Sequence, residues 1–414
     1  MQTMTISSEP GNASTATLKR ELKAAQARKR AAALLLIAPL AIFLFLIFVV
    51  PIAALLTRAV QNPEVADALP KTVVQLHAWD RKSEPPATAY VALATDLAAA
   101  QDGEVMGGLA RRLNVEIPGY RSLVAKTARA LPFADDAGHP LALTPEQMRA
   151  KLIDLDARWG EGRYWRAIAK NGSHYSPFYL LASLDHRQDA FGHIERTDPD
   201  QRIYLSVFGR TFVIGAVVTL AALLLGYPLA YWISTLSERR ANLAMILVRV
   251  AAWIVILQTE GLVNHSLRGL GLIHAPLELL FNRTGVYISM THILLPFMIL
   301  PLYSVMKSIP KTYQRAAVSL GSHPFAAFWR VYVPQTYPGI GAGALLVFIL
   351  AIGYYITPAL LGGPNDQMVS YYVAYFTNVT INWGMACALG GLLLAATLVL
   401  YAVYGRFTRG QPSL

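Results

Sequence analysis

The chain has 414 residues, of which 54% are hydrophobic and 15% charged, and its mean hydropathy is +0.39. Such values favour a protein with several membrane spans over a soluble domain. The net charge of +11 would suit a nucleic-acid-binding protein, but residues 61–200 hold 16 basic and 19 acidic residues, so the excess lies elsewhere. The single cysteine, Cys387, excludes an internal disulfide.

The chain begins with a polar segment that becomes rich in Lys and Arg, and we expect residues 1–30 to form a cytoplasmic basic leader. Residues 31–58 follow as the first predicted transmembrane helix. Its apolar run of about 26 residues is too long for the core of a signal peptide, which spans 7–15 residues. We therefore expect this segment to remain as an anchor.

Residues 59–205 form a long hydrophilic insert, large enough to fold as a small domain. One helix in it is clearly indicated, because Thr144 offers an N-cap, Pro145 a first-turn proline and Gln147 a capping-box partner. Gly160 is expected to end this helix. Its apolar residues repeat at helical spacing: Met148, Leu152, Leu155 and Trp159.

Five further apolar runs lie between residues 206 and 406, which we interpret as a five-helix core followed by a tail, residues 407–414. Each is close to the 20 residues that a helix needs to cross a bilayer, and lipid leaves no other way to satisfy their backbone hydrogen bonds. The predicted fold class is therefore all-α and integral to the membrane. The runs cover residues 208–233, 243–262, 286–306, 339–361 and 385–404.

The excess basic residues gather at the ends of these runs, as the positive-inside rule describes. This distribution places both termini in the cytoplasm and the insert outside it. The basic residues concerned are Lys19, Arg20, Lys23, Arg28, Lys29, Arg30, Arg239, Arg240, Lys307, Lys311, Arg315, Arg330, Arg406 and Arg409.

The loop at residues 307–338 contains four basic residues and no acidic one, so we place it in the cytoplasm. It carries the spacing A-A-x3-G-x9-hydrophobic-x-hydrophobic-P. The residues at these positions are Ala316, Ala317, Gly321, Val331, Val333 and Pro334. This pattern resembles the cytoplasmic EAA loop by which permease subunits of binding-protein-dependent ABC importers dock on their ATPases.

Two short helices are expected in this loop, joined at Gly321, where glycine permits a turn that a side chain would hinder. Pro334 is expected to end the second helix before the next span. Arg315 departs from the resemblance, because the family usually has Glu there, and a cation at this position would pair with an acidic site on a partner. An ordinary amphipathic loop lying on the membrane is the alternative interpretation.

Further segments resemble the spermidine/putrescine branch of these permeases, and together the resemblance covers about 200 residues. The segments are Arg210-Thr211 and residues 224–231, 249–253, 261–264, 270–273, 295–303, 357–364 and 382–386. The resemblance implies the type I ABC importer permease fold, with six transmembrane helices, in the bacterial inner membrane. The long insert after the first helix departs from this branch.

The resemblance also implies partners: a cytoplasmic ATPase dimer, a second permease subunit that is either a copy of this chain or another chain, and a periplasmic substrate-binding protein. Membrane lipid surrounds the spans, and no nucleic acid is involved. The chain has no G-x-x-x-x-G-K-[ST] loop, and no lysine follows any glycine. We therefore expect no enzyme activity and no cofactor in this chain, with ATP bound by the partner subunit.

Charged residues inside predicted spans are candidates for the substrate path, because burying a charge in lipid is costly. Arg249 and Glu260 are such residues, and Trp253 lies between them as a possible stacking surface for a cationic solute. Snorkelling, wetting at the interface and aromatic belting are the structural alternatives. Asp366, which follows a Gly-Gly-Pro turn, is expected to be solvated.

The combined interpretation is a permease subunit of an ATP-driven importer for polyamines or a similar small polar solute. A permease of the same superfamily for iron, sulfate, phosphonate or an opine would share the same motifs. A membrane sensor with an extracytoplasmic domain remains a second class, although the cytoplasmic segments are too short for a signalling domain. The insert is either a docking surface for the binding protein or a spacer.

Overall fold

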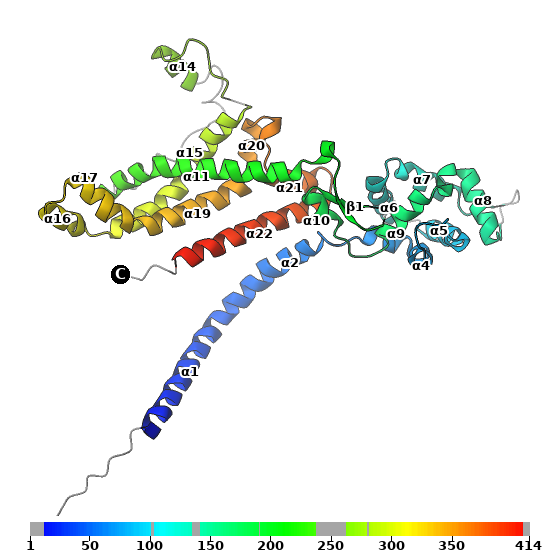
Figure 1. Cartoon of the computed structure of the whole chain (residues 1–414), viewed down its shortest axis with the longest axis horizontal. Coiled ribbons are helices and arrows are strands. Elements are labelled where there is room, and N and C mark those ends of the chain that lie inside the picture. Colours follow the sequence, from blue (N-terminus) through cyan, green and yellow to red (C-terminus); the bar gives the residue numbers. More distant parts are fainter. Residues whose placement is uncertain are drawn as a thin grey trace, which may run out of the picture. The chain divides into compact units, whose positions relative to one another are not determined.

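A computed structural model describes residues 12–100, 103–134, 141–189, 191–236, 262–279 and 281–408. The chain divides into two units, residues 1–57 and 58–414. Among the described residues only β1 (His186–Gln188) and β2 (Ile194–Arg196) are strands, and they pair in an antiparallel hairpin. The predicted all-α fold class is therefore confirmed apart from this hairpin (Figure 1).

The first unit is a long helix formed by α1 (Asn12–Leu44), the π-helical turn η1 (Phe45–Val49) and α2 (Val50–Thr57). Its apolar stretch, Lys23–Thr57, is long enough to cross a membrane, and its leucine, isoleucine and phenylalanine side chains are exposed. Apolar side chains all round a single helix are suited to lipid rather than water. The first predicted span is thus confirmed, and its helix begins earlier than the sequence indicated.

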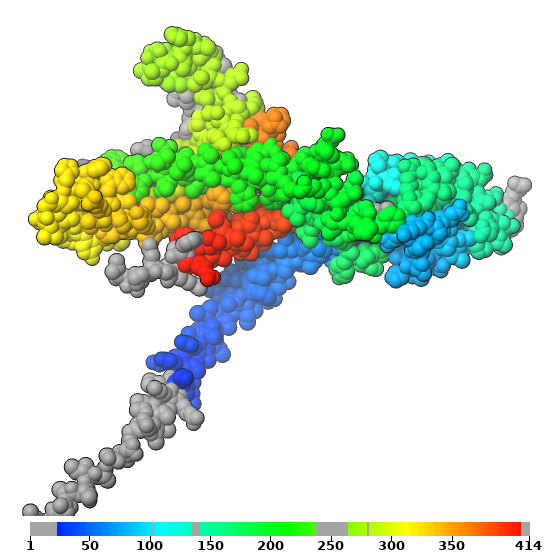
Figure 2. Space-filling model, viewed as in Figure 1, coloured from blue at the N-terminus to red at the C-terminus, as the bar shows by residue number. Residues whose placement is uncertain are grey.

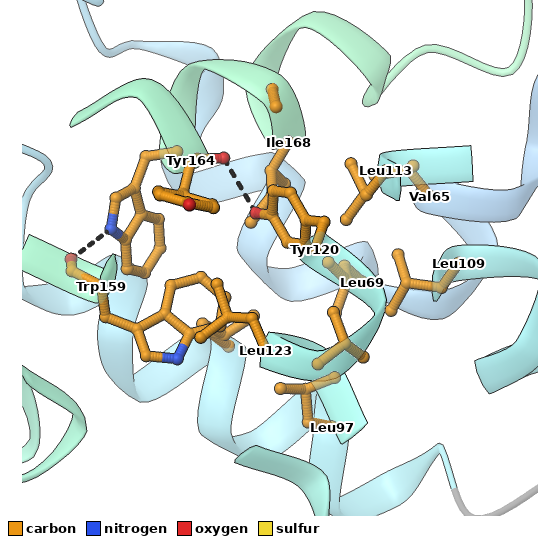
Figure 3. Packing of buried hydrophobic residues seen from close by; sticks show 14 of the residues in the cluster. Val65, Leu69, Leu97, Leu109, Leu113, Tyr120, Leu123, Trp159, Tyr164 and Ile168 are labelled. Carbon is orange, nitrogen blue, oxygen red and sulfur yellow. Dashed lines mark hydrogen bonds between the residues drawn. The ribbon is translucent and has the colours of Figure 1, made fainter. Parts of the chain in front are cut away.

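The insert consists mainly of short helices. They are α3 (Pro63–Ala68), α4 (Pro70–His77), α5 (Ala87–Ala99), α6 (Gly103–Glu116), α7 (Tyr120–Ala130), α8 (Pro145–Leu155), η2 (Ala157–Gly160), α9 (Gly162–Asn171), α10 (Phe178–Ser183) and, after the hairpin, η3 (Pro199–Gln201). Val65 of α3 and leucines from α4 to α8 pack around buried aromatic side chains in a core that belongs to the insert itself (Figure 3).

The polar atoms of these buried aromatic side chains all find partners. Trp165 Nε1 donates to the backbone carbonyl of Trp159 at 2.8 Å, and the Tyr120 hydroxyl donates to the carbonyl of Tyr164 at 2.9 Å (Figure 3). Trp159 Nε1 donates to the hydroxyl of Thr127 at 2.9 Å. Burying these groups unpaired would cost about 1–3 kcal/mol each, so the bonds let large aromatic surfaces contribute their full hydrophobic stabilisation.

The capping box predicted at Thr144 is present, since its hydroxyl accepts from the Gln147 backbone and the Gln147 side chain accepts from the Thr144 backbone. The predicted end of this helix is wrong. α8 ends at Leu155, and Asp156 turns the backbone into an extended conformation before η2. The reason is local, because the Asp156 carboxylate accepts hydrogen bonds from the backbone and guanidinium of Arg158 and so starts a new turn.

The hydrogen bond from the Arg158 side chain holds the pKa of Asp156 well below its usual value of 3.8. A carboxyl group whose pKa falls on folding stabilises the fold above its unfolded pKa, and this contribution is lost as the pH drops below about 4. We expect Asp156→Asn to flatten the acid side of the unfolding curve of the chain, measured by urea titration between pH 2.5 and 6. Arg158→Gln should flatten it equally, and the double variant no further; additive losses would contradict the pairing.

The membrane core is built on α11 (Tyr204–Thr235), α15 (Arg283–Ser308) and α19 (Tyr337–Gly353), which pack side by side (Figure 1). Glycines allow these helices to approach closely. A Cβ on Gly215 would lie 2.7 Å from Ile352, and one on Gly343 would lie 2.8 Å from the Met298 sulfur. Lipid provides no hydrophobic driving force for helix association. The close van der Waals packing that small residues allow at such crossings therefore holds the helices together.

Four described helices have the length and composition of a membrane span, whereas α19 (Tyr337–Gly353) reaches that length only together with the helix before it, Pro324–Gln335, from which it is bent by 59°. The span predicted at 339–361 is shorter than expected, because α19 ends at Gly353 and a separate helix, α20 (Ile356–Leu361), follows. The span predicted at 243–262 lies outside the described residues. The remaining elements are α14 (Leu262–Gly269), η5 (Pro364–Asp366), α21 (Val369–Asn378) and α22 (Trp383–Thr408).

The insert joins the core through α10 and the start of α11. The Tyr179 ring packs against α22 at Gly384, where a Cβ would lie only 2.3 Å from it. The buried Asp185 carboxylate accepts from the backbone nitrogens of Tyr204 and Leu205 at 3.0 and 2.8 Å, which caps the first turn of α11. The insert and the spans are therefore linked by buried contacts rather than by an open linker.

Candidate functional site

The loop after α15 forms two helices joined by a turn. The first is α16 (Lys311–Ser319); the second runs through α17 (Pro324–Ala327), the π-helical turn η4 (Phe328–Tyr332) and α18 (Val333–Gln335). We call residues 311–335 the knob. Figure 2 shows it in yellow at the end of the core where α15 and α19 meet. The predicted pair of short helices is confirmed.

Gly321 ends the first helix in the way that the sequence indicated. Its φ is +91°, its N–H bonds to the carbonyl of Val318 at 3.0 Å, and the N–H of Ser322 bonds to the carbonyl of Ala317 at 3.1 Å. This pair of bonds is a Schellman motif, which satisfies the last helical carbonyls and needs a left-handed residue. Glycine adopts that conformation without the steric cost that other residues meet.

The second helix differs from the prediction at its end. Its start is capped, because the Phe325 N–H donates to His323 Nδ1 at 3.3 Å. Pro334 does not end it, since the preceding π-turn accommodates the missing N–H and the helix continues to Gln335. The backbone instead bends by 59° at Thr336, before α19 begins.

Side chains from α11 hold this bend in place, and sequence reasoning missed them. The buried Thr336 hydroxyl donates to the carbonyl of Val333 at 2.7 Å, so the Tyr227 hydroxyl, 3.2 Å away, donates to Thr336. One turn further along α11, Tyr231 packs its ring 5.2 Å from Phe328 and 5.4 Å from Tyr332. The two tyrosines are four residues apart, a spacing that places them on one helical face and was visible in the sequence.

The residues predicted for coupling separate into an outer and an inner set. Arg315, Ala316 and Gly321 are exposed, whereas Ala317, Val331 and Pro334 are half-buried and Val333 is buried. The outer surface also presents large apolar side chains that the motif did not single out: Tyr313, Val318, Leu320, Phe325 and Trp329. Leu320, beside Gly321, is 89% exposed. An apolar tip of this kind on a polar loop marks an interaction surface.

The loop's charge is entirely positive. Lys307, Lys311, Arg315 and Arg330 are exposed, and in the part of the chain that the structure describes none of them forms an ion pair. A partner that covers this surface therefore needs an apolar groove with acidic groups at its edge.

The three candidates for the substrate path, Arg249, Trp253 and Glu260, lie outside the described residues. No cluster of three or more His, Cys, Asp or Glu side chains suited to a metal occurs among the residues that were described. The site features that the structure shows are therefore those of the knob and of the first turn of α15.

Asp366 corrects a prediction, because it is buried rather than solvated. Its Oδ1 pairs with Arg283 Nε at 2.8 Å, and its Oδ2 accepts from the N–H of Gly363 at 3.1 Å. The two charged residues are 83 positions apart, so no local pattern indicates the pair. The pair ties the Gly-Gly-Pro turn to the start of α15.

Removing the charge of Asp366 should loosen the start of α15. We expect Asp366→Asn to destabilise the chain by about 1 kcal/mol, less than the roughly 1.5–3 kcal/mol of a hydrogen bond to a charged group, because Arg283 is half-exposed and solvent screens it. The thermal aggregation midpoint in detergent should fall by a few degrees. Asn365→Asp, at the preceding position, is the control. An equal fall of the midpoint in both variants would contradict a stabilising role of the Arg283–Asp366 pair.

Comparisons with known proteins agree with this architecture. Residues 211–411 match the family described as "Binding-protein-dependent transport system inner membrane component". The spermidine/putrescine transport system permease protein PotB of Salmonella typhimurium (strain SL1344) is 31% identical over 218 residues, covering 50% of this chain and 76% of that protein. PotB of Escherichia coli (strain K12) is 32% identical, covering 50% and 79%.

A crystal structure of a bacterial alginate ABC transporter, in complex with an alginate pentasaccharide-bound periplasmic protein, contains a similar chain. It is 16% identical, with a TM-score of 0.41, and the match covers 50% of this chain and 79% of that one.

Proposed function

This chain belongs to the family of binding-protein-dependent transport system inner membrane components, and we propose that it is the permease subunit of an ATP-driven polyamine importer. In this proposal it carries spermidine, putrescine or a similar small polar solute across the bacterial inner membrane. Both termini and the knob face the cytoplasm, and the insert faces the periplasm. The identity to two spermidine/putrescine permeases supports the choice of solute.

The knob carries the proposal that transport is coupled to a separate ATPase. Its tip is apolar and exposed, a Schellman turn fixes its shape, and Tyr227 and Tyr231 connect its base to α11. A force applied to Leu320 or Phe325 is passed through packed side chains to the spans rather than absorbed by a loose loop. The chain supplies the path and the coupling, and ATP is bound and hydrolysed by the partner.

The proposed assembly contains two ATPase subunits, a second permease and a periplasmic binding protein. We propose that the insert adds a docking surface for the binding protein, because it has its own core and is joined to α11 and α22 by buried contacts. Deleting residues 62–200 should then abolish stimulation of the ATPase by the binding protein. Stimulation that survives the deletion would favour a spacer.

The first experiment is purification of the chain from its native membrane in mild detergent, comparing wild type, Gly321→Asp and Leu320→Asp. An ATPase should accompany the wild type and be lost from both variants, while Leu272→Asp, exposed but outside the knob, keeps it. The co-purified binding protein is then titrated with spermidine and putrescine. No ATPase with any form would contradict the coupling, and a binding protein that ignores both polyamines would contradict the solute.

A further inference from the structure

A cavity of about 850 Å³ lies beside the knob, where the ends of α11 and α15 meet α16. Of the exposed apolar side chains of the tip, Val318 lines the cavity, whereas Leu320 and Phe325 do not. Its lining contains three cations, Lys307, Lys311 and Arg315, and no Asp or Glu among the described residues.

The three cations are brought together by the fold. Lys307 lies in the last turn of α15, and Lys311 and Arg315 are four residues apart on one face of α16. Like charges at this spacing repel, and within the described part of the chain no carboxylate pairs with any of them. An anion is therefore the expected occupant.

The rest of the lining is mixed, with polar side chains such as Ser234, Thr235 and Gln314 and an apolar group at the ends of the spans. Leu236 follows α11, Met306 lies in the last turn of α15, and Ile309 follows that helix. The cavity thus joins a cationic side to an apolar group at the C-terminal ends of α11 and α15, two helices with the composition of membrane spans. A free phosphate or a protein carboxylate would contact only the cationic side, whereas a phospholipid would contact both the cationic and the apolar side.

We propose that this cavity binds the headgroup of an anionic phospholipid, with the phosphate between Lys311 and Arg315 and the acyl chains against Leu236 and Ile309. Basic pockets between the ends of transmembrane helices suit such headgroups. Because Lys311 and Arg315 belong to α16, the lipid bridges the knob and the surrounding bilayer. The proposal goes beyond the transport function and depends neither on the solute nor on the ATPase.

The test is a lipid titration of the purified full chain, followed by native mass spectrometry, with phosphatidylglycerol and phosphatidylcholine as probes. Wild type should bind phosphatidylglycerol at least tenfold more tightly than phosphatidylcholine. Lys311→Gln/Arg315→Gln should weaken phosphatidylglycerol binding roughly thirtyfold, as expected for two cations near an anionic surface. Arg330→Gln/Arg406→Gln removes the same charge from exposed positions outside the cavity and should stay within twofold of wild type.

The charge-preserving variant Lys311→Arg/Arg315→Lys keeps the anion site and should bind like wild type, which separates loss of charge from misfolding. Equal weakening in both neutralised double variants would mean diffuse electrostatics and would overturn the proposal. Displacement of phosphatidylglycerol by a few millimolar inorganic phosphate would assign the site to a free anion instead. Unchanged lipid binding, with loss of a co-purifying ATPase in Lys311→Gln/Arg315→Gln alone, would assign the cations to a carboxylate on that partner.

Discussion

Replacing Gly321 by valine is expected to reduce solute uptake at least tenfold while the chain remains in the membrane at its normal level. Gly321 has a φ of +91°, where a β-branched residue costs about 1–2 kcal/mol or more, and no neighbour would clash with the new Cβ. The strain therefore acts on the Schellman turn alone. When that turn opens, the exposed tip at Leu320 no longer has a fixed position relative to α16 and α17.

The chain provides a matched control for this prediction. Gly271 has a φ of +69°, open space around its Cβ position and the same pattern of hydrogen bonds, since Gly271 N–H reaches Arg268 and Leu272 N–H reaches Leu267. Gly271→Val imposes the same kind of strain outside the knob. Uptake should be normal in that variant, measured with labelled polyamine in cells. Equal losses in both variants would mean that strain in general, and not the knob, limits transport.

Placing a methyl group on Gly384 is expected to separate the insert from the spans. The new Cβ would lie 2.3 Å from the ring of Tyr179, which is buried. Overpacking of this size typically costs about 1–3 kcal/mol. Gly384→Ala should therefore lower the thermal stability of the chain and expose the segment around α10 to limited proteolysis.

Two further variants define the cause of that effect. Gly390→Ala lies in the same helix with open space around its Cβ position, so it should leave stability unchanged or raise it slightly. Tyr179→Ala removes the obstructing ring, and in the Tyr179→Ala background Gly384→Ala should cost almost nothing. Strictly additive losses would show that the two residues do not interact in the folded chain.

The parts of the fold that the sequence predicted are those with local causes. In lipid, an apolar run of about 20 residues can satisfy its backbone hydrogen bonds only as a helix. Helices therefore cover five of the six predicted spans, and the sixth lies outside the described residues. The capping box at Thr144 and the turn at Gly321 also depend on neighbours within a few residues. For such features one sequence is sufficient.

The parts that escaped prediction depend on contacts between distant positions. The pair of Arg283 and Asp366, and the approach of Tyr179 to Gly384, each join segments far apart in the chain. The bend at Thr336 was not predicted, because Pro334 was expected to end the helix. The π-helical turn before Pro334 accommodates the proline instead, and the bend follows two residues later. Hydrophobic spacing alone carries no information on such pairings.

Because Asp185 caps α11, the insert is expected to move together with this helix when the helix tilts. Because the cap and the Tyr179 contact fix the insert to the starts of α11 and α22, a small tilt of either helix is converted into a larger displacement of the distant insert helices. The chain's only cysteine is Cys387, so Cys387→Ser gives a background in which two dyes are placed at will. A dye pair on exposed positions outside the knob, such as Tyr175 and Tyr401, would then follow the transport cycle in single molecules as a change in energy transfer.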